Sequence, residues 1–148
     1  MICVACNDKS KQSLPVESKI YEVVGSTEER INTISSLLTK QASLPSSILD
    51  AQFVQEQLGD SNFGPSDFRS FYFLAISPAD IPKWKQRLVP LTEPVSYLEP
   101  QAAKAWWVKQ TEFSGLKFFE PAPLAGNPNG WIGINQQTGQ IYIFTFTM

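Results

Sequence analysis

The sequence predicts an α+β fold: a mainly antiparallel sheet with two principal helices and a C-terminal β-hairpin. Two segments space their apolar residues as a helix does, and they lie among segments rich in aromatic and β-branched residues. The last part of the chain has the pattern of a strand, a turn and a strand. Helices interspersed with strands that end in a hairpin are typical of α+β domains. We therefore expect one globular domain over residues 19–148.

The first helix is predicted to begin after a short extended piece at residues 19–24 and to end near residue 40. Ser26 and Glu29 have the spacing of a capping box, in which each side chain accepts a hydrogen bond from the other residue's backbone N–H. Apolar residues then recur at the spacing of one helix face, and these are Ile31, Ile34, Leu37 and Leu38.

Two strands are predicted next. Residues 48–58 fit either a helix or a strand, and we favour a strand because residues 58–66 are rich in the turn formers Gly, Asn and Pro. Residues 67–76 form the clearest core strand, since every residue from Phe71 to Ile76 is apolar or aromatic.

The second helix is predicted from Ser77 to Leu88. Ser77 suits the N-cap and Pro78 the first turn, and the inward face would carry Ile81, Trp84 and Leu88. Prolines then predict an irregular stretch, which a short helix at 101–108 interrupts.

The chain is expected to end in strands. A helical turn at 111–114 precedes a strand at 116–119, and the hairpin pairs 131–135 with 140–147. Both faces of the last strand are apolar, which indicates that it is central or covered on both sides.

Composition excludes several function classes. Among the 148 residues, 12 Lys and Arg stand against 14 Asp and Glu, so the net charge of −2 gives no electrostatic reason to expect a nucleic-acid partner or an anionic membrane surface. The chain contains no histidine, which excludes Ser-His-Asp and Cys-His catalysis and every His-ligated zinc site. No cofactor and no metal are expected.

Both cysteines lie in the opening Met1-Ile2-Cys3-Val4-Ala5-Cys6. A Cys-x-x-Cys redox site normally lies between a strand and a helix, but here only two residues precede the first cysteine and no helix pattern follows. A structural zinc site needs four protein ligands, and the chain has no second cysteine pair. Neither interpretation is favoured.

Val4-Ala5-Cys6, followed by polar residues, resembles the end of a bacterial lipoprotein signal peptide, although Cys3 stands where Leu is usual. The resemblance implies that residues 1–6 are the remnant of a signal with Cys6 as its lipidation site, and that residues 7–18 form a polar tether. It places the protein in the bacterial cell envelope, on the periplasmic side of a membrane that it contacts only through this anchor. The alternative is a cytoplasmic protein with two inert N-terminal thiols.

The leading function hypothesis is a non-enzymatic, envelope-tethered interaction protein with a protein partner. Of 18 aromatic residues, 15 occur from residue 68 onward, more than a small core readily hides. We expect Trp107 to be exposed beside the Pro-rich stretch 90–100, and Trp84 with Lys83 and Arg87 to extend this surface. An immunity or inhibitor role toward a toxin or wall hydrolase is one version of this hypothesis.

The alternative hypothesis is a carboxylate-dependent hydrolase, which would use Asp67 with Glu56 or Asp60. A simpler interpretation of this region is that Asp67 binds turn amides and that Arg69 is a cross-strand partner. Residues 60–64 also resemble the opening of a calcium loop, but Pro65 and Phe71 occupy the positions that need Gly and Glu, so a turn is favoured there.

Overall fold

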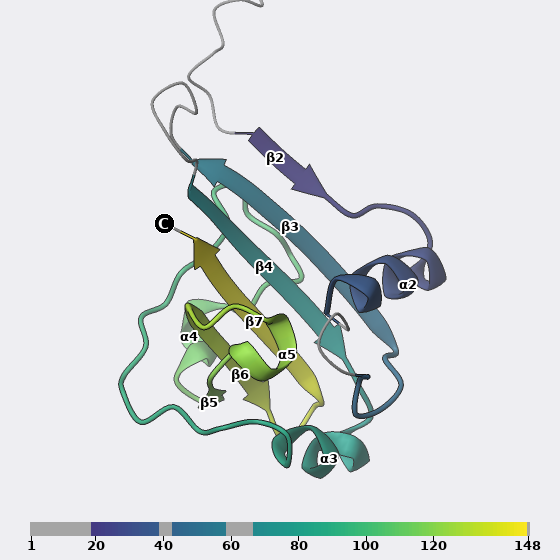
Figure 1. Ribbon diagram of the computed structural model, residues 1–148, viewed down its shortest axis with the longest axis vertical. Coiled ribbons are helices and arrows are strands. Elements are labelled where there is room, and N and C mark those ends of the chain that lie inside the picture. The colour runs from purple at the N-terminus through teal and green to yellow at the C-terminus, as the bar shows by residue number, and fades with distance from the viewer. Residues whose placement is uncertain (1–18, 39–42, 59–66, 148) are drawn as a thin grey trace, which may run out of the picture.

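A computed structural model describes residues 19–38, 43–58 and 67–147 and confirms the α+β fold (Figure 1). Six strands form one antiparallel sheet in the order β2-β3-β4-β7-β6-β5. The strands are β2 Lys19–Glu22, β3 Asp50–Leu58, β4 Asp67–Ala75, β5 Lys117–Phe119, β6 Gly130–Asn135 and β7 Gln140–Thr147. The helices are α2 Thr27–Leu38, the 3₁₀ turn η2 Pro78–Asp80, α3 Ile81–Lys85, α4 Gln110–Phe113 and α5 Ala122–Ala125.

Helix α2 begins with the predicted capping box. The Ser26 N–H donates to Glu29 Oε1 at 2.9 Å, and the Glu29 N–H donates to Ser26 Oγ at 3.2 Å. Arg30 then fastens the helix to β3, since its Nη2 lies 2.7 Å from Asp50 Oδ1 and its Nε donates to the Ala51 carbonyl at 3.0 Å. The capping box therefore determines where α2 begins, and the contacts of Arg30 orient the helix on the sheet.

The sheet has two covered faces. On the helix face, side chains of the central strands pack against α2, α3 and α5. On the opposite face they pack against residues 91–116, a segment that is irregular apart from α4 and that we call the strap. We call the side of the sheet that it covers the strap face. Ile141 and Ile143 of β7 belong to the helix face, whereas Tyr142 and Phe144 belong to the strap face. This confirms that the last strand is central and covered on both sides.

The two edges of the sheet differ. At β5 the chain from Val89 to Leu91, where the strap begins, lies along the edge. The Leu91 N–H donates to the Phe118 carbonyl at 3.0 Å, and the Glu120 N–H donates to the Val89 carbonyl at 2.8 Å. At β2, no described strand pairs with the outer side, and both Ile20 and Tyr21 are more than half exposed.

The second helix is shorter than predicted. It consists of η2 and α3 and ends at Lys85 rather than Leu88. Pro78 and Pro82 lack an N–H, and the chain after Lys85 closes in tight turns in which Arg87 N–H donates to the Trp84 carbonyl and Leu88 N–H to the Lys85 carbonyl, both at 3.1 Å. Its inward face is as predicted, since Ile81, Trp84 and Leu88 are buried.

Two further expectations need correction. Residues 101–108 are not a helix but a series of turns, with one backbone bond from Trp107 to Lys104 at 3.0 Å. Conversely, α5 was not predicted, although Pro121 just before it and Gly126 just after it are the residues that start and stop helices. Gly126 has φ 74°, which is the left-handed conformation that a helix C-terminus often needs.

Candidate binding pocket

The predicted partner-binding residues do not form one surface, because Trp84 and Trp107 lie on opposite faces of the sheet. Trp84 is only 1% exposed, and its Nε1–H donates to Ser46 Oγ at 2.7 Å. A tryptophan with its ring buried and its N–H bonded has no free contact surface for a partner. The prediction that Trp84 extends an exposed partner-binding surface is therefore wrong, whereas its predicted place on the inward face of the helix is confirmed.

The same correction applies to Trp107, which is 5% exposed. Its ring centroid lies 5.1 Å from that of Phe71, 5.8 Å from that of Trp131 and 5.5 Å from that of Tyr142. Its Nε1–H donates to the Leu98 carbonyl at 2.8 Å. The strap gives the sheet a second covered face, and that face takes up the surplus of aromatic residues.

Burial in this cluster also affects Tyr142. Loss of solvent around its hydroxyl, followed by the nearby Glu112 carboxylate, raises the pKa of Tyr142 to about 12. Burial therefore makes the phenol of Tyr142 still harder to ionise, as expected of a side chain that fills the core.

Lys83 and Arg87 are exposed, and each makes one polar side-chain contact with the described residues. Lys83 Nζ lies 3.3 Å from Asp80 Oδ1, and Arg87 Nη1 donates to the Ser43 carbonyl at 2.6 Å. Arg87 and Trp84 also line a cavity of about 340 Å³ beside α5, where the Arg87 guanidinium is already bonded. Both cations lie on the helix face of the sheet, and their charged groups bind different partners and do not converge on one site.

The carboxylates of the hydrolase hypothesis lie on one face but in different surroundings. Glu56 pairs with Arg69 in the register of β3 and β4, so Asp67, two residues before Arg69, shares the strap face with Glu56. Glu56 is 1% exposed, its Oε2 accepts the Gln101 N–H at 2.6 Å, and its Oε1 has no partner among the described residues. Asp67 is exposed, and Asp60 lies outside the described residues. The strap thus separates Glu56 from solvent, while Asp67 faces it.

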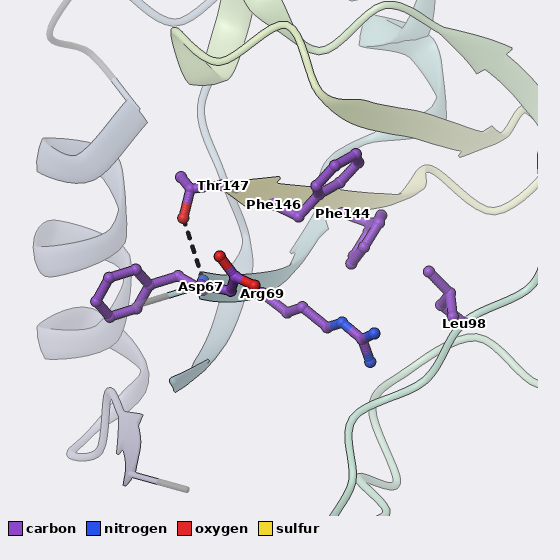
Figure 2. A pocket seen from close by; sticks show the side chains of 7 residues that line it. Asp67, Arg69, Leu98, Phe144, Phe146 and Thr147 are labelled. Carbon is purple, nitrogen blue, oxygen red and sulfur yellow. Dashed lines mark hydrogen bonds between the residues drawn. The ribbon is translucent and has the colours of Figure 1, made fainter. Parts of the chain in front are cut away.

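Asp67 and Arg69 instead line a pocket of about 330 Å³, which we call the end pocket (Figure 2). It lies where β4 begins and β7 ends, beside the strap. Its lining residues are Asp67, Phe68, Arg69, Leu98, Phe144, Phe146 and Thr147.

Strand register builds the apolar wall of the end pocket. Arg69 is directly opposite Phe146 and Phe71 is opposite Phe144, so Phe144 and Phe146 project on the same face as Arg69. Their rings are stacked, with centroids 5.7 Å apart and planes at 26°. Leu98 contributes from the strap, where the hydrogen bond from Trp107 holds its backbone.

Two charged side chains in this pocket are unpaired. Within the described part of the chain, neither the Arg69 guanidinium nor the Asp67 carboxylate forms a hydrogen bond or an ion pair. Figure 2 shows Arg69 reaching from β4 toward Leu98, whereas the Asp67 carboxylate lies on the side of Thr147, whose Oγ1 accepts the Phe68 N–H at 3.1 Å. The pocket thus offers a cation and an anion beside aromatic rings. Asp67 and Arg69 were noted in the sequence, but nothing in it indicated that Phe144, Phe146 and Leu98 would join them.

Other types of site are not found in the described residues. No group of three or more Cys, Asp or Glu side chains in this part of the chain is placed to hold a metal ion. None of its helices is long and apolar enough to cross a membrane. No protein-family model matches the chain, and searches of curated proteins and of solved structures give no significant match.

Proposed function

We propose that this chain is a non-enzymatic binding protein of the bacterial envelope, anchored through Cys6, that receives part of a protein partner in the end pocket. The observation that carries the proposal is the combination of apolar walls with the side chains of Arg69 and Asp67, which have no partner among the described residues. Binding pockets are typically apolar with a few polar groups that fix orientation and specificity. Because the Arg69 guanidinium forms no hydrogen bond or ion pair with the described residues, a ligand can bind it without breaking one.

The surroundings of Glu56 favour binding over hydrolysis. A pair of catalytic carboxylates must reach the same bound substrate. Glu56 is not part of the pocket lining, and one of its oxygens accepts the Gln101 N–H. Among the described lining residues, Asp67 is therefore the one carboxylate that faces the pocket.

The position of the first strand is compatible with anchoring. Lys19 pairs with Gln57 near the end of β3, so the beginning of β2 lies at the same end of the sheet as Asp67 and Thr147 (Figure 1). Cys6 precedes Lys19 by 13 residues, which can span at most about 45 Å. An anchor at Cys6 would keep the beginning of β2 within that distance of a membrane, with the end pocket at the same end of the sheet.

A fragment screen tests the pocket. We expect some small organic fragments to shift the backbone amide signals of residues 67–69 and 144–147 in ¹H–¹⁵N NMR spectra. Leu98→Arg should abolish these shifts, because a long cationic side chain would fill the space beside Arg69. The matched control is Leu49→Arg, since Leu49 is 60% exposed and lies near the opposite end of β3.

Two results would contradict this proposal. If no fragment of any class shifts these signals, the end pocket is not a binding site. If the chain turns over a substrate and Asp67→Asn removes that turnover, the protein is an enzyme and the hydrolase hypothesis replaces ours.

Anchoring is tested separately by fractionation. When the full gene is expressed in a bacterium, the protein should sediment with membranes, and Cys6→Ser should release it into the soluble fraction. Cys3→Ser is the matched control, since Cys3 lies in the segment that signal cleavage removes, and it should leave the membrane fraction unchanged. Membrane association that survives Cys6→Ser would exclude this anchor.

A further inference from the structure

We infer that the end pocket recognises the C-terminal carboxylate of a peptide whose last residue is apolar. This inference rests on the proposed function and specifies its ligand. Three features carry it: the unpaired Arg69 guanidinium, the negative charges around that arginine, and the stacked rings of Phe144 and Phe146.

Arg69 supplies the anion-binding group. A guanidinium presents its N–H donors in a planar fork that matches a carboxylate in two parallel hydrogen bonds. Arg69 is half-buried, lies opposite Phe146 and lines the pocket together with Leu98, so its side chain is partly shielded from water. Charge-assisted hydrogen bonds are stronger in such surroundings than in open solvent.

The negative charges nearby select a monoanion. Asp67 lines the same pocket, and Glu56 is opposite Arg69 on β3. Arg69 and these two carboxylates already sum to one negative charge, so every further negative charge on a ligand adds repulsion. A phosphate dianion would add two such charges and a carboxylate only one. A carboxylate is therefore preferred to a phosphate.

The remaining lining fits the last residues of a peptide. The rings of Phe144 and Phe146, with Leu98, offer an apolar surface to one side chain, and a volume of about 330 Å³ is at the small end of ligand pockets. Asp67 is two residues from Arg69 along β4, which is about 6.6 Å. From there the charged groups point apart, Arg69 toward Leu98 and Asp67 toward Thr147 (Figure 2). An extended peptide whose carboxylate binds Arg69 would place the N–H of its penultimate residue on the side of Asp67.

The test compares two peptides that differ only at the C-terminus: acetyl-Ala-Ala-Leu as the free acid and the same peptide as the C-terminal amide. We expect the free acid to shift the amide signals of residues 67–69 and 144–147 in a saturable way. The amide should bind at least about tenfold more weakly, the change expected when a charge-assisted hydrogen bond is lost. Decanoate, an acid without a peptide N–H, should also bind more weakly than the peptide acid.

Variants locate the carboxylate. Arg69→Gln should weaken binding of the free acid at least about tenfold and remove the difference between acid and amide. Arg69→Lys, which keeps the charge but not the fork, should retain part of that difference. Arg87→Gln is the matched control, since this exposed arginine lies on the helix face, and it should change nothing. Circular dichroism checks that each variant is folded, and the acid–amide comparison on the unaltered protein does not depend on any variant.

The inference is overturned if the acid and the amide bind equally, if the acid gives no shift at millimolar concentration, or if Arg69→Gln binds the acid as the unaltered protein does. Tighter binding of decanoate would also overturn it, in favour of a lipid acid. In each case, fragments of other chemistry that still shift the pocket signals would leave the proposed binding function intact. If no fragment shifts the pocket signals, both the inference and the proposed binding function are wrong.

Discussion

Trp107→Ala is expected to lower the free energy of unfolding by about 3–5 kcal/mol, the usual cost of deleting a large buried aromatic side chain. The ring packs against those of Phe71, Trp131 and Tyr142, so its removal leaves a cavity between large rings that the sheet holds in place. The variant also leaves the Leu98 carbonyl without the indole donor. Urea denaturation followed by circular dichroism measures the loss.

The neighbouring tryptophan provides the control. Trp106 is only partly buried, and its ring contacts Trp107 from the outside, with centroids 6.1 Å apart. Trp106→Ala should therefore cost clearly less than Trp107→Ala. If Trp107→Ala instead changes stability by less than about 1 kcal/mol, as substitutions on the surface do, Trp107 is exposed and the strap does not cover this face.

Gly130→Ala is the second change with a large expected effect, about 4 kcal/mol or more, or loss of folding. Gly130 begins β6 opposite Thr145 with φ 124°, a conformation that residues with a Cβ rarely adopt. A Cβ placed there would overlap the backbone carbonyl of Phe144 and lie 2.9 Å from the Thr145 Cα. Both contacts are with backbone atoms of β7, a central strand, and these atoms cannot move away as the end of a flexible side chain can.

Gly115→Ala is the control for this substitution. Gly115 does not have positive φ, and the nearest atom to an added Cβ is the Glu112 carbonyl oxygen at 3.6 Å, an ordinary contact. Thermal unfolding of the two variants should differ clearly. Equal midpoints would mean that β6 and β7 do not approach each other as closely as the structure places them.

Sequence patterns that extend over only a few residues predicted most of the secondary structure. The capping box of Ser26 and Glu29 predicted the start of α2, and the unbroken apolar run from Phe71 predicted the core of β4. The hairpin of β6 and β7 could be predicted because its strands and its turn are neighbours in sequence. In each case the side chains that determine the element lie within it.

The burial of Trp107 and the end pocket could not be predicted in this way. Whether Trp107 is exposed depends on an irregular segment that crosses the sheet without any periodic pattern. The end pocket requires the register that places Arg69 opposite Phe146, 77 residues later in the chain. The residues next to Arg69 and Phe146 in sequence do not indicate that pairing, because it depends on how the whole sheet between them assembles.

The unequal edges of the sheet limit how copies of this domain could associate. Open-ended growth by strand pairing requires two available edges on every molecule, one to receive a neighbour and one to offer to the next. The Val89 carbonyl, which accepts the Glu120 N–H, and the Leu91 N–H, which donates to the Phe118 carbonyl, occupy the β5 edge, which leaves β2 as the edge available in the described part of the chain. Pairing through β2 would bring two molecules together and stop there, so sheet extension yields a closed pair and not a fibre.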